Sequence, residues 1–386
     1  MNEAYVVEAV RTATGRRKGA LAETHPIDLG AQVLNALAAR TGIDPAALDD
    51  VVMGCVTQGG EQAFAFGRNC VLASDYPVTV PATTVDRQCG SSQQAVQFAT
   101  QAVMSGTQDM VVAAGVESMT RVPMFSNLKL YEDAGIGTGS MSPMMINRFG
   151  VPSFSQFAGA QKIAENYGFS REDLDAFAVE SHKKAAAAIE AGMFKDEIVP
   201  VKTGDGMFDT DEGVRPGTTV EILGGLNPIE EGGVLTAGNA SQMSDGSAGL
   251  LIANERAIKA HGLTPIARIA HVSVSAGDPI IMLEEPIRAT RRALEKSGMS
   301  LDDIDIYEVN EAFASIPMAW LDALNADPAK LNVRGGAIAL GHPLGASGAR
   351  LMTTMIHALR DRGEKYGLQT MCEGGGTANV TIIEAL

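Results

Sequence analysis

The chain is poor in the residues and runs that mark several large protein classes. Its 386 residues contain four cysteines and one tryptophan, and aromatic side chains make up 5%. So few cysteines do not form a disulfide framework, which favours free thiols in a reducing compartment. No apolar run approaches the roughly 20 residues that span a bilayer, and the opening MNEAYVVEAVRT has no signal-like apolar segment. We therefore expect a cytoplasmic protein that has no contact with membranes.

Positive charge is also scarce. Thirty Lys and Arg stand against 46 Asp and Glu, which leaves a formal net charge of −16. This balance argues against non-specific nucleic-acid binding, although a local basic patch is enough for an anionic small ligand. The length exceeds one ordinary core and predicts two domain-sized units, and 42 glycines with 45% hydrophobic residues suggest an α/β protein with tight turns.

An internal repeat supports two units. TGIDPAALDDVVMGCVTQ begins at Thr41 and SGMSLDDIDIYEVNEA begins at Ser297. Both contain LDD, and aligning these tripeptides gives an offset of 253 residues, which also places Cys89 on His342. Each stretch reads as a helix end, a Gly stop, a turn and a strand. We expect two copies of one β-α-β-α unit, whose helix N-termini converge near a pseudo-two-fold axis.

The repeat also locates an insertion. In the second copy LQTMCEGGGT turns directly into the last strand, NVTIIEAL, whereas in the first copy the strand DMVVAAGVES finds its partner only at GSAGLLIANE, from Gly246. The residues between are an excursion with two helical patterns and Gly/Asp-rich loops, and excursions of this length are usually functional. The predicted division is an N-terminal half (1–119 plus 245–260), an inserted loop domain (120–244) and a C-terminal half (261–386).

One cysteine stands at a strand-to-helix corner. In TTVDRQCGSSQQAVQFATQAVMSG, Cys89 follows a short β-branched strand and precedes a long helix. A helix N-terminus stabilises an anion and lowers the pKa of a cysteine placed there. Gly90 leaves room for a ligand to approach the backbone. A buried structural cysteine is the alternative, and we expect that role for Cys55 and Cys70.

Three further polar residues share such positions, at a strand end or a helix start, where α/β proteins place their ligands. Singly, an Asn here is often a helix cap and a His between Gly and Pro a turn residue. The four together favour a catalytic site. They are Cys89 in DRQCGSSQQA, Asn310 in EVNEAFAS, His342 in GGAIALGHPLGASGAR and Cys372 in MCEGGGTANV.

These motifs resemble those of the thiolase family, which makes or breaks 3-ketoacyl-CoA. The resemblance runs from VVEAVRTATGR at Val6 through LTAGNAS at Leu235 to the last strand, and so covers essentially the whole chain. It implies an α/β thiolase-like fold of two repeated β-α-β-α-β-α-β-β halves. Together the halves would give a layered α-β-α-β-α core, and the inserted loop domain would bind CoA and the acyl chain.

The resemblance implies a role for each motif residue. Cys89 resembles the nucleophile that carries the acyl group, and His342 the base that activates it. Cys372 resembles the second acid/base, which exchanges a proton with the acetyl methyl group. The N–H groups of Cys89 and Gly374 resemble one oxyanion hole, and His342 with a water held by Asn310 resembles the other.

The substrate site is implied by the same resemblance. Ser241, in TAGNAS, resembles a pantetheine contact, and Phe313 with its neighbour Ala312 resembles a wall of the same tunnel. Met144, in a cluster with Met141 and Met145, is expected to line the acyl site, because methionine moulds around apolar chains. One departure stands out: many relatives have LRP where this chain has LNP, with Asn227 at the position of an arginine that holds the nucleotide end of CoA.

The expected function is reversible, CoA-dependent cleavage of 3-ketoacyl-CoA, or the reverse Claisen condensation, through an acyl-cysteine in fatty-acid β-oxidation. The alternatives are an acetoacetyl-CoA-specific acetyltransferase, a decarboxylating condensing enzyme, which the Cys372 motif disfavours, and a non-catalytic acyl-CoA-binding relative. CoA is a substrate, and the resemblance implies neither cofactor nor metal. It implies a homodimer or homotetramer, associated in some relatives with other β-oxidation subunits.

Overall fold

The structure is a computed structural model that describes residues 2–386, and its centre is one mixed sheet. Along the sheet the strands run β11-β12-β13-β10-β1-β9-β5-β3-β4. The N-terminal half supplies β1 (Tyr5–Thr12), β3 (Asp50–Gly54), β4 (Ala82–Val85), β5 (Met110–Ser118) and β9 (Ser244–Ala253). The C-terminal half supplies β10 (Ala267–Ala276), β11 (Ile306–Val309), β12 (Tyr366–Glu373) and β13 (Thr377–Ala385).

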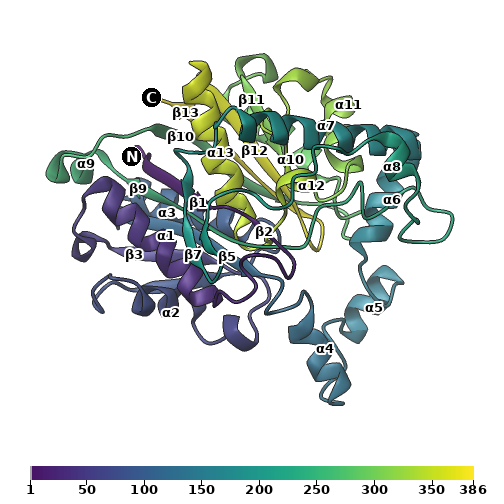
Figure 1. Cartoon of the computed structure of the whole chain (residues 1–386), viewed down its shortest axis with the longest axis horizontal. Coiled ribbons are helices and arrows are strands. Elements are labelled where there is room, and N and C mark those ends of the chain that lie inside the picture. The colour runs from purple at the N-terminus through teal and green to yellow at the C-terminus, as the bar shows by residue number, and fades with distance from the viewer. Residues whose placement is uncertain (1) are drawn as a thin grey trace.

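Helices cover the strands of the N-terminal half and those of the C-terminal half, and two further helices lie between these two parts of the sheet (Figure 1). The outer helices of the N-terminal half are α1 (Pro26–Thr41) and α2 (Phe66–Ala73), and those of the C-terminal half are α10 (Glu285–Ser297) and α11 (Ser315–Leu324). The two central helices are α3 (Ser91–Ser105) and α13 (Ser347–Arg362). Shorter pieces are α9 (Glu255–His261), α12 (Ala337–Leu340) and the 3₁₀ turns η1 (Pro45–Ala47), η2 (Gly60–Gln62), η3 (Leu301–Asp303) and η4 (Pro328–Lys330).

The hydrophobic clusters follow these layers. One cluster joins α3 and α13 to strands of both halves, through side chains such as Val96, Met352 and Ile306. A second packs α1 and α2 against the N-terminal strands, and a third packs α10 and α11 against the C-terminal strands. All nine residues of β5 are buried, as expected for a strand with helices on both faces. The predicted α-β-α-β-α layering is confirmed.

The repeat is present, but its expected register is wrong. The central helices begin at Ser91 and Ser347, an offset of 256 residues rather than 253. Asp49 accepts hydrogen bonds from the N–H groups that open β5, and Asp305, 256 residues later, does the same for β12. The LDD match misled because Leu301 opens the turn η3, whereas Leu48 follows the turn η1.

The corrected register changes which residues are equivalent. Cys89 is equivalent to Gly345, three residues beyond His342, so the nucleophile and base candidates are not repeat partners. The second half also departs from the expected strand pattern. Where the first half has β4, the second has a single bridge between Tyr307 and Leu331.

The segment between β5 and β9 contains several elements of its own. The two strands pair antiparallel from Met110 opposite Ala253 to Ser118 opposite Asp245. Figure 1 shows α4 and α5 projecting from the body, whereas α6 packs on α11 and α7 on α12. The elements are α4 (Ser126–Asp133), α5 (Pro143–Phe149), α6 (Gln156–Tyr167), α7 (Arg171–Glu190), α8 (Val220–Gly224), β6 (Ile198–Val199), β7 (Val201–Thr203) and β8 (Gly206–Phe208). The short β2 (Gly15–Arg16) pairs with β9, and β6 pairs with β1.

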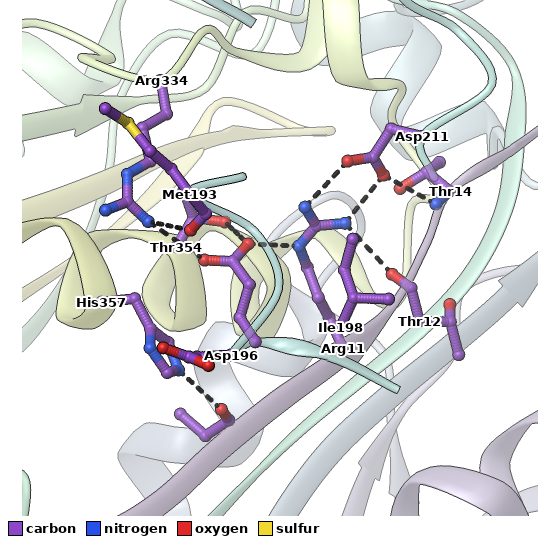
Figure 2. A network of polar contacts seen from close by, with 12 residues as sticks. Arg11, Thr12, Thr14, Met193, Asp196, Ile198, Asp211, Arg334, Thr354 and His357 are labelled. Atoms are coloured by element: carbon purple, nitrogen blue, oxygen red, sulfur yellow. Dashed lines mark hydrogen bonds and ion pairs between the residues drawn. The ribbon is translucent and has the colours of Figure 1, made fainter. Parts of the chain in front are cut away.

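A buried charge network ties this segment to the core (Figure 2). The Arg11 guanidinium, on β1, donates to both oxygens of Asp211 at 2.7 and 2.8 Å and to Glu197 at 2.5 Å. The second oxygen of Glu197 faces Arg334 at 3.6 Å, and Thr354 of α13 donates to the first. A buried carboxylate left without its cation is costly, so Arg11 holds together three distant parts of the chain.

Replacing Arg11 by Ala is therefore expected to destabilise the fold strongly. The substitution leaves Glu197 and Asp211 buried without their main cation, a change that typically costs about 3–5 kcal/mol. The matched control is Arg16→Ala, which breaks an ion pair to Glu212 in which the arginine side chain is 66% exposed. That change should cost less than about 1 kcal/mol. Thermal and urea unfolding midpoints measure both, and equal shifts would contradict the assignment.

Candidate active site

Cys89 lies in the corner between β4 and α3, with 9% of its surface exposed. The residue before it, Gln88, has φ 48°, a left-handed conformation that is strained for a side chain of this kind. Ser91 holds the corner: its hydroxyl accepts from Arg87 N at 2.9 Å and donates to Gln88 O at 2.6 Å. Strain of this type persists where the surroundings enforce it, often at functional sites.

His342 lies in the corresponding region of the C-terminal half, between α12 and α13. The backbone N–H of His342 donates to Gln242 O at 3.0 Å, which anchors the residue to the end of the inserted segment. Gly341 precedes it with φ +89°, and a Cβ there would meet the Ser244 hydroxyl at 2.3 Å. Only glycine fits both the conformation and the space, so this position fixes the path of the chain into His342.

Ser347 sets the tautomer of the His342 imidazole. The Ser347 hydroxyl donates its one proton to Pro343 O at 2.9 Å and lies 2.6 Å from Nδ1 of His342. With that proton on Pro343 O, the hydroxyl accepts from Nδ1–H, which leaves a lone pair on Nε2. Asn310 Nδ2 lies 3.4 Å from Nε2. The imidazole thus presents its basic nitrogen toward Asn310 and the site.

Asn310 and Cys372 meet on this side of the imidazole. Asn310 follows β11, is fully buried, and has no hydrogen-bond partner for Oδ1 among residues 2–386. Cys372 lies near the end of β12. Burial raises the pKa of its thiol to about 12, while the amide of Asn310 acts in the opposite direction.

Burial keeps both thiols and the imidazole neutral. It raises the pKa of the Cys89 thiol well above the usual value, and the nearby Cys372 and Glu373 raise it further. The expectation that the helix start lowers this pKa is wrong, because desolvation outweighs the partial charge of the helix. Burial, followed by the charge of Arg350, lowers the pKa of His342 to about 3. A neutral thiol and a neutral base require proton transfer at the moment of attack.

The glycine loop between β12 and β13 closes the site. A Cβ built at Gly374 would lie 2.9 Å from Oε1 of Gln88. Gly374 therefore lies next to the corner that holds Cys89. Gly376 has φ +76°, and a Cβ there would meet Asp278 O at 2.7 Å. Its carbonyl accepts from Gly277 N at 2.8 Å. A side chain is therefore excluded at Gly376, and without side chains at all three glycines the backbone of the loop can lie close to a substrate.

A cavity of about 760 Å³ opens onto Cys89 and Gly374. Most of its lining is apolar, and half of the lining residues come from positions 124–156, which contain the projecting helices. Asp86 and Arg148 are its charged residues. Met141 and Met145 line it, whereas Met144 is 83% exposed and lies outside the lining, so the structure does not bring this predicted residue to the site. The main apolar residues are Met124, Phe125, Leu128, Met141, Met145, Phe149, Phe154, Met282 and Leu344.

Ser241, Ala312 and Phe313 are held together by backbone contacts. The backbone N–H of Ser241 donates to Ala312 O at 2.9 Å, and Ala240 forms an isolated antiparallel β-bridge with Phe313. Phe313 is buried and packs edge-on against Phe157, with ring centroids 5.6 Å apart. None of the three lines the 760 Å³ cavity. They join the inserted segment to the Asn310 motif, two residues from the catalytic candidate.

Cys55 and Cys70 do not line the 760 Å³ cavity. Cys55 and Cys70 are buried and free, and burial raises the pKa of each thiol. Within residues 2–386, no helix is long and apolar enough to cross a membrane, and no group of three or more His, Cys, Asp or Glu is placed to hold a metal ion.

The chain belongs to the thiolase family. The N-terminal thiolase domain model matches residues 4–256 and the C-terminal thiolase domain model matches residues 263–385. The activity is that of an acyltransferase, which cleaves 3-ketoacyl-CoA reversibly with CoA.

Individual relatives agree over the whole length. The chain is 55% identical to the steroid 3-ketoacyl-CoA thiolase FadA6 of Mycobacterium tuberculosis, over 100% of this chain and 95% of that one. It is 40% identical to the 3-ketoacyl-CoA thiolase of Bacillus subtilis, over 100% of both. The crystal structure of the Bacillus anthracis acetyl-CoA acetyltransferase superposes with a TM-score of 0.91 at 37% identity, covering 100% of this chain and 99% of that one.

Two residues of the site were not found by sequence reasoning. Ser347 follows His342 by five residues in GHPLGASGAR, a spacing that lets the helix start turn back on the histidine. Glu373 stands beside Cys372 in the motif itself, where a carboxyl group next to a buried thiol was a visible signal.

Ser347→Ala is expected to lower kcat by about 5-fold, since one hydrogen bond worth about 1 kcal/mol no longer holds the basic tautomer of His342. The matched control is Ser92→Ala. Ser92 is equally buried between α3 and α13, but it accepts from Ala349 N and does not touch His342. Steady-state thiolysis with kcat and KM resolved measures both. Equal kcat losses in both variants would show that packing alone, and not the tautomer, is affected.

Proposed function

We propose that Cys89, His342, Cys372, Asn310 and Gly374 carry the thiolase reaction. In thiolysis, Nε2 of His342 takes the Cys89 proton, and the sulfur attacks the 3-keto carbon. The bond between C2 and C3 breaks, its electron pair passes into the acetyl-CoA enolate, and Cys372 donates its proton to C2. CoA then gives its proton to Cys372 and attacks the acyl-Cys89 thioester. Cys89 leaves and recovers its proton from His342.

The hydrogen bonds described above support this assignment. Because Nδ1–H is engaged with Ser347, a proton taken by Nε2 turns the ring into a donor directed toward the side of Asn310. That donor suits the developing enolate oxygen, and the N–H groups of Cys89 and Gly374 suit the tetrahedral oxyanion at the acyl carbon. The scheme uses CoA as substrate and needs no metal or prosthetic group. We assign Ser241, Ala312 and Phe313 to the pantetheine side. Asn227, at the LNP position, leaves the nucleotide end of CoA without the arginine of many relatives.

Cys372→Ser separates the two halves of this scheme. Acyl transfer needs only Cys89, His342 and an oxyanion hole, whereas carbon–carbon cleavage also needs a proton donor at C2. The variant should acylate at Cys89 with acetyl-CoA, detected by peptide mass spectrometry, but lose at least about 100-fold in thiolysis, the lower range for general acid–base catalysis. Cys55→Ser is the control and should retain both activities. Full thiolysis by Cys372→Ser would remove this residue from the mechanism.

We further propose that the acyl substrate is bulky and steroid-derived. The observation that carries this is the 55% identity to a steroid 3-ketoacyl-CoA thiolase over the full chain. The 760 Å³ cavity with methionine and phenylalanine walls supports it, because such walls adapt to a large apolar group. The second candidate is an acetoacetyl-CoA-specific enzyme, since the Escherichia coli acetyl-CoA acetyltransferase is also similar, at 41% identity.

A graded substrate series distinguishes the two. We expect kcat/KM for a ring-bearing 3-ketoacyl-CoA to exceed that for acetoacetyl-CoA by at least about 10-fold, since each buried methylene contributes roughly 1–3 kcal/mol. Met141→Phe with Met145→Phe should abolish this preference and leave acetoacetyl-CoA cleavage nearly unchanged. Met144→Phe is the matched control, outside the cavity lining. A preference for acetoacetyl-CoA in the unmodified enzyme would favour the second candidate.

Location and assembly are also proposed. The four cysteines are all free, as a reducing cytoplasm would keep them. The projecting helices expose apolar side chains, including Leu130 and Tyr131 on α4, which agrees with a homodimer or homotetramer, with or without other β-oxidation subunits.

A further inference from the structure

Two buried glutamates occupy equivalent positions in the two halves. Glu117 lies near the end of β5 and Glu373 at the end of β12, separated by the same 256 residues as the central helices. Both are fully buried. Each faces the start of the other half's central helix: Glu117 accepts from Gly345 N at 2.9 Å, and the Glu373 carboxyl lies against Gly90.

Their surroundings differ sharply. Glu117 accepts from the N–H groups of Val56 and Thr57 at 2.9 and 3.0 Å and from the Gln62 amide at 2.8 Å, in addition to Gly345. Four donors suit a carboxylate. Neither oxygen of Glu373 accepts a well-formed hydrogen bond among residues 2–386, and the Thr377 hydroxyl is the one donor there that lies close enough to lower its pKa by hydrogen bonding. A buried carboxylate with so few donors is unfavourable, so this site favours the neutral acid.

Glu373 also adjoins both thiols. It follows Cys372 in the chain, and its Oε1 would lie 1.8 Å from a Cβ at Gly90, the residue after Cys89. As a carboxylate it raises the pKa of both thiols. Each thiol becomes an anion during the proposed reaction: Cys89 when it attacks, and Cys372 after it protonates C2.

We propose that Glu373 is a positioning residue that acts as a neutral acid, and that loss of its proton places a negative charge beside both thiols and suppresses the reaction at alkaline pH. The proposal rests on the catalytic roles given above.

The groups that face Glu373 agree with this reading. They are Asp86 and Arg87 from the segment before α3, Cys89 from the same corner, Cys372 from its own strand, and the hydroxyl of Thr377 from β13. Burial raises the pKa of Glu373 to about 8, while Thr377 and Arg87 oppose this and Asp86 adds to it. The uncharged amide of Asn379 lies nearby and donates to Gly90 O at 3.2 Å. Asp86 and Arg87 carry opposite charges, so desolvation is the main cause of the raised pKa of Glu373.

The test replaces Glu373 by Gln, which has the same shape and cannot ionise. With whichever 3-ketoacyl-CoA the unmodified enzyme cleaves best, kcat/KM should fall above about pH 8 in the unmodified enzyme. Glu373→Gln should retain it, with a difference of about 10-fold or more at pH 9.5, one and a half pH units above that pKa. At pH 7, where most molecules hold the Glu373 proton, the difference between the two should be much smaller than at pH 9.5. The same fall in kcat/KM above pH 8 in both enzymes would overturn the proposal. Loss of activity in Glu373→Gln at every pH would also overturn it.

Two further measurements keep the outcome clear. The rate of Cys89 alkylation by iodoacetamide, followed from pH 6 to 10, reports how readily the Cys89 thiol ionises and does not require turnover. It should rise more steeply above pH 8 in Glu373→Gln, and equal slopes would count against the proposal even if the catalytic roles failed. The folded state binds the Glu373 proton more tightly than the unfolded chain, so stability is lost as pH rises from about 4.5 toward 8. The gain in Tm of Glu373→Gln over the unmodified protein should therefore be larger at pH 8 than at pH 5, and a constant difference would contradict the assignment.

Discussion

The close approach of α3 and α13 is the constraint on which the site depends. A Cβ at Gly348, in the first turn of α13, would lie 2.3 Å from Gln93 N of α3, so the helices meet backbone to backbone. A Cβ at Gly115 would likewise lie 2.2 Å from Gly345 O. Larger residues would force the helices apart and, with them, the two halves. Because Cys89 and His342 precede these helices, their separation is set by glycine contacts rather than by the side chains themselves.

Pseudo-symmetry supplies the scaffold, and the departures from it supply the chemistry. At the 256-residue offset, Cys89 is equivalent to Gly345 and Asn310 is equivalent to Gly54. Glu373, which accepts few hydrogen bonds, is equivalent to Glu117, which accepts four. The N-terminal half therefore provides the candidate nucleophile, and the C-terminal half provides the histidine, the asparagine and the second cysteine. Equivalent strand ends converge on one place, but their side chains differ, so a symmetric frame surrounds an asymmetric site.

Desolvation governs the charge state of this site at rest. The start of α3 favours an anion at Cys89, yet burial raises the pKa of the thiol, lowers that of His342 and raises that of Glu373. All these groups are therefore neutral near pH 7. Charge must be created and removed locally during the reaction, where fixed hydrogen bonds such as that between Ser347 and His342 can direct the proton.

The sequence by itself determined the family, the layered α/β fold and the placing of Cys89, Asn310, His342 and Cys372 at strand ends and helix starts, because these are local patterns of residue type and spacing. It did not determine the 256-residue register, since a three-residue LDD match carries no information on which residues form the turn. Nor did it determine the raised pKa of Cys89, the outward direction of Met144 or the sparse hydrogen bonding of Glu373 within residues 2–386. Those depend on burial and on contacts between residues hundreds of positions apart, and only the packing of the two halves against each other decides them.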